Sequence, residues 1–123
     1  MSGPLLDFRG KVVEVRKQLI PKMYVTVVED DSGKARIEFD THQDLVVYRE
    51  GERLQVTISK EVPEYREGED YVVRATLVST RQNEGGGSAY LFSAGGLLFI
   101  VELREGSLDV IPTEKYFIRI ARV

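Results

Sequence analysis

The sequence contains no cysteine and a single histidine, His42. Without cysteine the chain cannot form a disulfide framework, a thiolate zinc site or a catalytic thiol, and one histidine excludes a metal site built from several imidazoles. No apolar run approaches the roughly 18 to 20 residues that span a bilayer. Residues 1–4 are followed by Asp7 and Arg9 instead of the apolar core of a secretory signal. We therefore expect a soluble protein located in the cytoplasm.

Neither sign of charge is in large excess. The 123 residues carry 17 lysines and arginines against 20 aspartates and glutamates, a net charge of -3. Nonspecific binding to DNA or RNA draws most of its free energy from the neutralisation of phosphates by basic side chains, so this balance disfavours a stand-alone nucleic-acid binder. The length fits one domain, residues 1–123, with a small core of its own. We expect the isolated chain to be monomeric.

The most apolar part of the chain is the run 88–104, which has no charged residue between Ser88 and Glu102. Two segments rich in strand-forming residues flank the pair Gly95-Gly96, a pattern typical of a hairpin that is largely buried. The glycine pair has two explanations: a tight turn that needs positive φ, or a place where another backbone comes close. Both explanations exclude a bulky side chain at this point.

The rest of the chain has the pattern of short strands separated by turn signals. Residues 34–40 alternate, with Ala35, Ile37 and Phe39 on one face and charged side chains on the other. No internal repeat is visible. The charged segment 61–70 and the glycine-rich segment 81–87 are predicted to be exposed loops, the second of them the most mobile. Further strands are predicted at 7–17, 22–29, 53–60, 71–80 and 115–123.

Two signals favour a barrel over a sandwich. Gly10 lies inside the first predicted strand, where a bulge or bend would let the strand turn a barrel corner, with Val13 and Val15 on one face. Thr41 and Asp44 resemble the start of a helix of at most about two turns. A helical turn between the third and fourth strands is typical of oligonucleotide-binding (OB) barrels. The sequence thus predicts an all-β, OB-like Greek-key barrel of about eight strands with at most one short helical turn.

No group of residues forms a recognisable catalytic or metal-binding motif. The acids Asp30-Asp31 and those of segment 67–70 lie in turns with glycine, where solvated carboxylates are expected. His42 has no serine or cysteine nucleophile in a suitable context. The triple glycine 85–87 is followed by neither Lys-Ser nor Lys-Thr, so it is not a phosphate-binding loop. We expect no catalytic residue, no metal and no cofactor.

Binding of single-stranded nucleic acid is the main alternative function, because OB barrels often stack bases on exposed aromatic side chains over a basic groove. When the net charge is negative, however, tyrosines at alternating strand positions are more often core residues or interface anchors. The candidate stacking residues are Tyr24, Tyr48, Tyr65, Tyr71, Tyr90 and Tyr116, and the candidate cations are Arg74, Lys115, Arg119 and Arg122.

Protein binding accounts better for the apolar segment Leu97-Leu98-Phe99-Ile100-Val101. Both faces of this predicted strand are apolar, so one face must contact something besides the barrel interior, either another part of this chain or another protein. Phe117 and Arg119 add an aromatic ring and a guanidinium, two types that are enriched at interface centres.

The same residues carry a resemblance to a known family. The run from Tyr90 to Leu98, with 70–73 before it and 116–120 after it, resembles the eighth-subunit family of archaeal and eukaryotic DNA-directed RNA polymerases. In that family an aromatic-rich strand runs into Gly-Gly-Leu-Leu, and the last strand carries arginine. The resemblance covers nearly the whole chain, although only the Gly-Gly-Leu-Leu block is distinctive. Segment 61–70 stands where eukaryotic members have a long acidic insertion, which points to the shorter archaeal form.

The resemblance implies an eight-stranded, OB-like barrel that acts as a non-catalytic assembly subunit in transcription. It also implies a position on the outside of the largest subunit, near its pore and funnel and away from the catalytic magnesium. The predicted interface residues are Gly95, Gly96, Leu97 and Leu98 of the family motif, with Tyr90, Phe92, Phe117 and Arg119 as flanking anchors.

Overall fold

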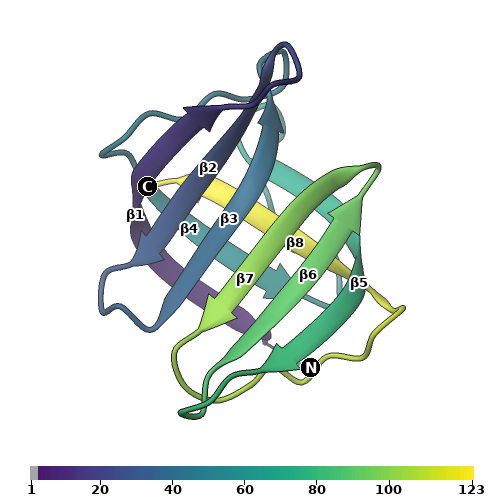
Figure 1. The fold of residues 1–123 in the computed structure, drawn as a ribbon. Helices are drawn as coiled ribbons and strands as arrows, with labels where there is room; N and C mark the ends of the chain where they lie inside the picture. Colours follow the sequence, from purple (N-terminus) through teal and green to yellow (C-terminus); the bar gives the residue numbers. More distant parts are fainter. Residues whose placement is uncertain (1–2) are drawn as a thin grey trace.

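Strands account for most of the structure, a computed structural model that describes residues 3–123. Over this range eight strands form a closed antiparallel barrel in the order β1-β2-β3-β7-β6-β5-β8-β4 (Figure 1). The same range contains no helix long and apolar enough to cross a membrane. The predicted all-β barrel is confirmed. Its strands are β1 (Leu6–Lys17), β2 (Met23–Asp30), β3 (Ala35–His42), β4 (Arg53–Ser59), β5 (Tyr71–Gln82), β6 (Ser88–Ala94), β7 (Leu97–Leu103) and β8 (Lys115–Arg122).

The barrel consists of two Greek keys. β1, β2 and β3 form a meander and β4 returns to pair with β1, which gives the spatial order β4-β1-β2-β3. β5 to β8 repeat this arrangement, and the pairs β3–β7 and β4–β8 join the two keys. In Figure 1 the two meanders stand side by side, with β4 and β8 crossing behind them. A pseudo-twofold repeat therefore relates residues 6–59, the first half, to residues 71–122, the second half.

Matching irregularities show that the repeat extends to local detail. β1 and β5 are each 12 residues long, and the register of each shifts directly after its seventh residue, Val12 or Leu77. The amide of Val12 donates to the carbonyl of Glu52, and the amide of Leu77 donates to that of Glu114, both at 2.9 Å. Each bulge lets one long strand pair first with one neighbour and then with another, which turns a barrel corner.

The core fills the barrel interior with the inward-facing residues of both halves. The alternation predicted for 34–40 is confirmed, since Ala35, Ile37 and Phe39 are all buried. Where β3 meets β7, the rings of Phe39 and Phe99 stack with their centroids 5.9 Å apart. Tyr48 packs edge-on against Phe39 at a centroid distance of 5.9 Å, so it closes one end of the barrel.

The segment after β3 contains turns and no helix, which agrees with the predicted limit of one short helical turn. The capping role predicted for Thr41 is wrong, because Thr41 belongs to β3, where it pairs with Tyr24 and is buried. In the turns that follow, the carbonyl of His42 accepts from the amides of Leu45 and Val46. Val46 and Tyr48 then pack on the core, so the chain crosses the barrel end.

The role predicted for Gly10 is also corrected. The bulge lies at Val13, which is 40% exposed, and Val12 and Val15 are the residues that pack on the core. Gly10 is instead a point of close approach, because a Cβ there would lie 2.1 Å from the backbone oxygen of Glu29. The glycine lets β1 pair with β2 and β4 at once.

Candidate protein interface

The Gly-Gly pair forms the tight turn between β6 and β7. Ala94 pairs with Leu97 across the turn, and Gly95 and Gly96 have φ values of 56° and 89°. Two successive positive φ angles are what a two-residue hairpin turn requires. Apart from its chain neighbours, no residue in the described range 3–123 lies within 4 Å of a Cβ built on either glycine. Within this chain, therefore, the turn explains the pair and close backbone approach does not.

The two leucines after the turn point to opposite sides of β7. Leu97 packs on the core, whereas Leu98 is 43% exposed on the outside of the barrel. The Leu98 amide donates to the carboxylate of Asp40 at 2.8 Å, where the β3–β7 ladder has ended at Phe39 and Phe99. Asp40 thus fixes the start of β7 and holds Leu98 on the outer face.

Tyr90 and Phe92 lie inside the barrel, so neither can be a surface anchor as predicted. Tyr90 is 2% exposed and Phe92 is fully buried. The Tyr90 hydroxyl donates to Ser88 Oγ at 2.9 Å and accepts from the Leu108 amide at 2.7 Å. These bonds attach the segment after β7 to the barrel end, which is a role in folding.

Arg119 is engaged within the chain. Its guanidinium donates to the Asp70 carboxylate at 3.0 Å, and Arg66 binds the other oxygen of this carboxylate at 3.1 Å. Asp70 also accepts from the Arg66 amide, and its side chain is fully buried, contrary to the predicted solvated acid. Burial alone would raise the pKa of Asp70, but the Arg66 amide and the charge of Arg119 outweigh it and hold that pKa below its ordinary value.

Phe117, beside Arg119 on β8, is half-buried.

The tyrosines do not form a stacking platform on the described surface. Tyr48, Tyr90 and Tyr116 are buried, and Tyr71 packs against Phe99 in the interior with its pKa raised to about 12 by burial. Of the other two, Tyr24 is half-buried and Tyr65 is 49% exposed in the 61–70 loop.

The candidate cations are also scattered. Arg122 stacks on the ring of Tyr48 at 4.9 Å and binds Glu52 at 3.0 Å. Arg74 and Lys115 lie exposed on β5 and β8, and Arg119 is bound to Asp70. Together these positions do not make a basic groove lined with aromatic rings.

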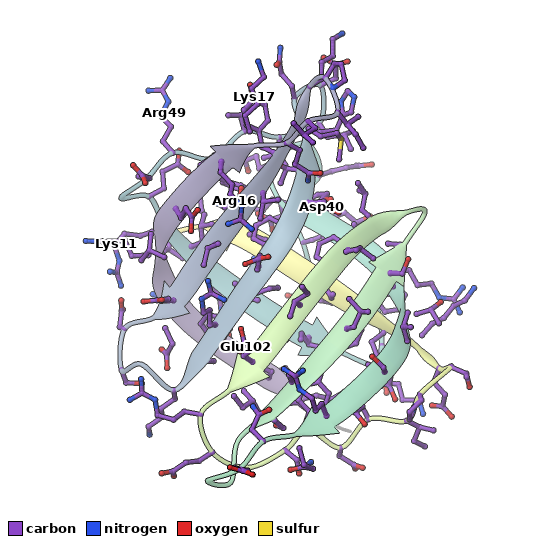
Figure 2. The ribbon with its side chains drawn as sticks, viewed as in Figure 1. Lys11, Arg16, Lys17, Asp40, Arg49 and Glu102 are labelled. Atoms are coloured by element: carbon purple, nitrogen blue, oxygen red, sulfur yellow. The ribbon has the colours of Figure 1, made fainter. Side chains whose placement is uncertain are left out.

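On the first half, ion pairs cover the outer face. Val27 of β2 points outward and yet is fully buried, because it lies between Glu14 of β1 and Glu38 of β3 in the ladder. Arg16 binds both of these carboxylates, at 3.0 and 3.2 Å. Figure 2 shows Arg16 lying over this face of the barrel. Arg36 extends the network to Glu38 at 3.7 Å and Glu102 at 3.0 Å.

On the second half, the outer face is apolar. Leu91 of β6 and Ile100 of β7 lie opposite each other and are only half-buried, and Leu98 is next along β7 on the same side. A hollow of about 440 Å³ opens here, lined by Ser79, Thr80, Arg81, Ala89, Tyr90, Leu91 and Ile100.

Sequence reasoning missed part of this surface. It located the outward apolar residues of β7 but placed Arg81 in a loop, whereas β5 continues to Gln82. Leu91 could have been found from strand alternation. It lies between Tyr90 and Phe92 in the sequence, so its side chain points to the opposite face of the strand from theirs.

The acidic residues and the histidine that were considered for catalysis or metal binding make local contacts in the structure. In the described part of the chain, no three residues among histidine, aspartate and glutamate are grouped closely enough to hold a metal ion. Asp31 binds Arg53, and Asp30 accepts from Ser32 and the Lys34 amide within its turn. The imidazole Nδ1 of His42 accepts from the Asp44 amide at 3.1 Å. These side chains are used by local structure.

Comparison with known proteins agrees with this arrangement. The family described as the G subunit of DNA-directed RNA polymerase matches residues 5–123. DNA-directed RNA polymerase subunit Rpo8 of Sulfolobus acidocaldarius is 28% identical over 99 residues, which are 80% of this chain and 80% of that protein. Catalysis by such an enzyme belongs to the whole complex, in which this subunit is a non-catalytic member. The chain belongs to the G-subunit family of DNA-directed RNA polymerases, the archaeal counterpart of the eighth subunit.

Proposed function

We propose that this structural subunit docks on the largest subunit of the polymerase through the outer face of β6 and β7. The observation that carries the proposal is the exposed apolar strip formed by Leu91, Leu98 and Ile100 on a barrel whose interior is already filled. Apolar side chains that the chain's own elements leave uncovered are typical of a surface that another protein covers.

The Gly-Gly turn supports the same face. Gly95 and Gly96 lie at the end of the strip, and a Cβ on either would contact none of the other residues that the structure describes. A turn without side chains lets a partner approach the backbone and the neighbouring Leu98 closely. Of the predicted interface residues, the turn and Leu98 therefore stay in the proposal. Phe117 lies half-buried on β8, which β5 separates from β6, so its interface role stays a prediction outside this strip. The same assembly would place the chain in the cytoplasm, as we also propose.

Co-expression of the tagged chain with the largest subunit tests the docking. We expect a stoichiometric complex, and we expect Leu98→Glu to weaken it at least tenfold, since a charge would then be buried in an apolar contact. Leu19→Glu is the matched control, because Leu19 is a fully exposed leucine in the turn between β1 and β2. The proposal fails if the largest subunit does not bind, or if Leu98→Glu weakens binding no more than Leu19→Glu does.

A nucleic-acid function is the alternative, and the buried tyrosines do not support it. The isolated chain should bind single-stranded oligonucleotides only weakly and in a salt-sensitive manner. Fluorescence anisotropy with a labelled oligonucleotide measures this affinity, and sub-micromolar binding at physiological salt would favour the alternative.

A further inference from the structure

The hollow on the second half lies at the position where, on the first half, Glu14, Arg16 and Glu38 form ion pairs over Val27. We call these three residues the cover. Aligning the bulges of β1 and β5 makes Ser79 the equivalent of Glu14, and Leu91 pairs with Ser79 as Val27 pairs with Glu14. Ile100 in turn pairs with Leu91 as Glu38 pairs with Val27. The two carboxylates that cover Val27 are therefore replaced by a short hydroxyl side chain and an aliphatic one.

The third member of the cover is the same residue type in both halves but differs in its contacts. Arg81 is the equivalent of Arg16, which binds Glu14 and Glu38. Among the residues that the structure describes, the Arg81 side chain makes no ion pair or hydrogen bond, and it lies exposed at the rim of the hollow. The second half thus keeps the cation and lacks both of its anions.

We propose that this hollow is a specificity pocket, which accepts one apolar side chain from the polymerase subunit on which the chain docks, next to a carboxylate of that subunit that pairs with Arg81. Leu91, Ile100 and Ala89 provide an apolar floor, and a volume of about 440 Å³ is ample for a single aliphatic or aromatic side chain. The partner's carboxylate would pair with Arg81 as Glu14 and Glu38 pair with Arg16 in the first half, and the partner's apolar side chain would cover Leu91. The inference rests on the proposed docking function and assigns its recognition chemistry.

Rebuilding the cover on the second half is the direct test. The double variant S79E/I100E places carboxylates on both sides of Arg81, as Glu14 and Glu38 flank Arg16. We expect the barrel to stay folded and the affinity for the isolated partner subunit to fall at least tenfold, because the chain's own ion pairs would occupy the pocket. The converse variant E14S/E38I is the control, and its affinity should equal that of the wild type.

Two further variants separate the pocket from its rim. Ser79→Leu should fill the hollow with an apolar group and weaken binding without adding charge. Arg81→Ala should lower the affinity at about 50 mM salt and leave little difference at about 500 mM, where an exposed ion pair is screened. Circular dichroism and melting temperature establish that each variant is folded. If S79E/I100E does not fold, Ser79→Leu and Arg81→Ala still decide the question.

The outcomes distinguish this inference from the docking proposal. If the wild type binds the largest subunit and both S79E/I100E and Ser79→Leu bind equally well, the pocket is wrong and the docking proposal stands. If the wild type binds a different purified polymerase subunit, and these variants lose that binding, the pocket is right and the choice of the largest subunit is wrong. An affinity for Arg81→Ala equal to wild type at low salt would overturn the carboxylate partner.

Discussion

The two halves of the barrel share a backbone and differ on the outside. In the first half, Val27 is sealed beneath Glu14, Arg16 and Glu38, whereas its equivalent Leu91 in the second half stays half-exposed. The inward positions are mostly apolar in both halves, because they fill one common core. The inward residues therefore set the fold, whereas the outward residues can differ between the halves and leave one face charged and the other apolar.

Small residues at the barrel corner provide the strongest test of the equivalence. Gly10 in β1 and Ala75 in β5 occupy corresponding positions, but a Cβ at Gly10 would lie 2.1 Å from the backbone oxygen of Glu29, whereas Ala75 carries its methyl group in the core. We expect Gly10→Ala to lower the free energy of unfolding by about 3 kcal/mol, because strands must separate to admit the methyl group. Urea denaturation measures this effect.

The matched change in the other half is Ala75→Gly. It should cost only about 1 kcal/mol, from the added freedom of the unfolded chain and the loss of one methyl group in the core. If Gly10→Ala and Ala75→Gly lowered the free energy of unfolding equally, the predicted difference in packing between the two corners would be wrong.

A buried ion pair is a second asymmetry between the halves. Arg119 of β8, whose equivalent in β4 is Thr57, binds the buried carboxylate of Asp70. Asp70→Asn should lower the free energy of unfolding at pH 7 by about 2 kcal/mol, because it leaves Arg119 and Arg66 without their anion.

The effect of Asp70→Asn should depend on pH in a defined direction. Because the folded state holds the pKa of Asp70 below its ordinary value, the stabilisation is present above the unfolded pKa of about 3.9. It is lost as the pH falls through the folded pKa. The difference between wild type and variant should therefore be constant from about pH 6 to 8 and shrink below about pH 4. A difference that persists unchanged at about pH 2 would rule out the ion pair as its cause.

The Gly-Gly turn of the second half is the next largest effect. Gly96→Val should destabilise the barrel by roughly 1 to 3 kcal/mol, because a β-branched residue is strained at a φ of 89°. Gly95→Asn is the control, since asparagine adopts the left-handed conformation near 56° at little cost. Thermal denaturation compares the two, and an unchanged melting temperature for Gly96→Val would refute the strain.

Alternation in the sequence predicted the strands and the barrel, because inward apolar positions such as those of β3 are flanked by polar residues. It could not decide which face of residues 88–101 is inside, since both are apolar. Only the ladder that pairs Phe92 with Phe99 and Tyr90 with Val101 places these aromatic residues in the core. Two predicted anchors were wrong for this reason.

The pseudo-twofold repeat and the buried Asp70 could not be predicted for a different reason. Equivalent positions such as Glu38 and Ile100 have opposite character, so the repeat is in the hydrogen-bond ladders and not in residue types. Asp70 ends a segment of charged residues that has the composition of a solvated loop, and one of the two arginines that bind its buried carboxylate, Arg119, is 49 residues away in the chain. Composition in a local window carries no information about such a partner.

The smallest expected effect concerns the cover of the first half. Glu38→Ile gives this face the residue that the second half has at Ile100, and it removes ion pairs of Arg16 and Arg36. Exposed pairs of this kind contribute about 0 to 1 kcal/mol each, and the new side chain packs beside Val27, so the free energy of unfolding should change by less than about 1 kcal/mol. Urea denaturation at low and high salt measures the change. A loss of several kcal/mol would mean that these ion pairs stabilise the first half of the barrel. A small change would mean that their main effect is to present a charged surface over Val27, a surface that the second half lacks at Leu91.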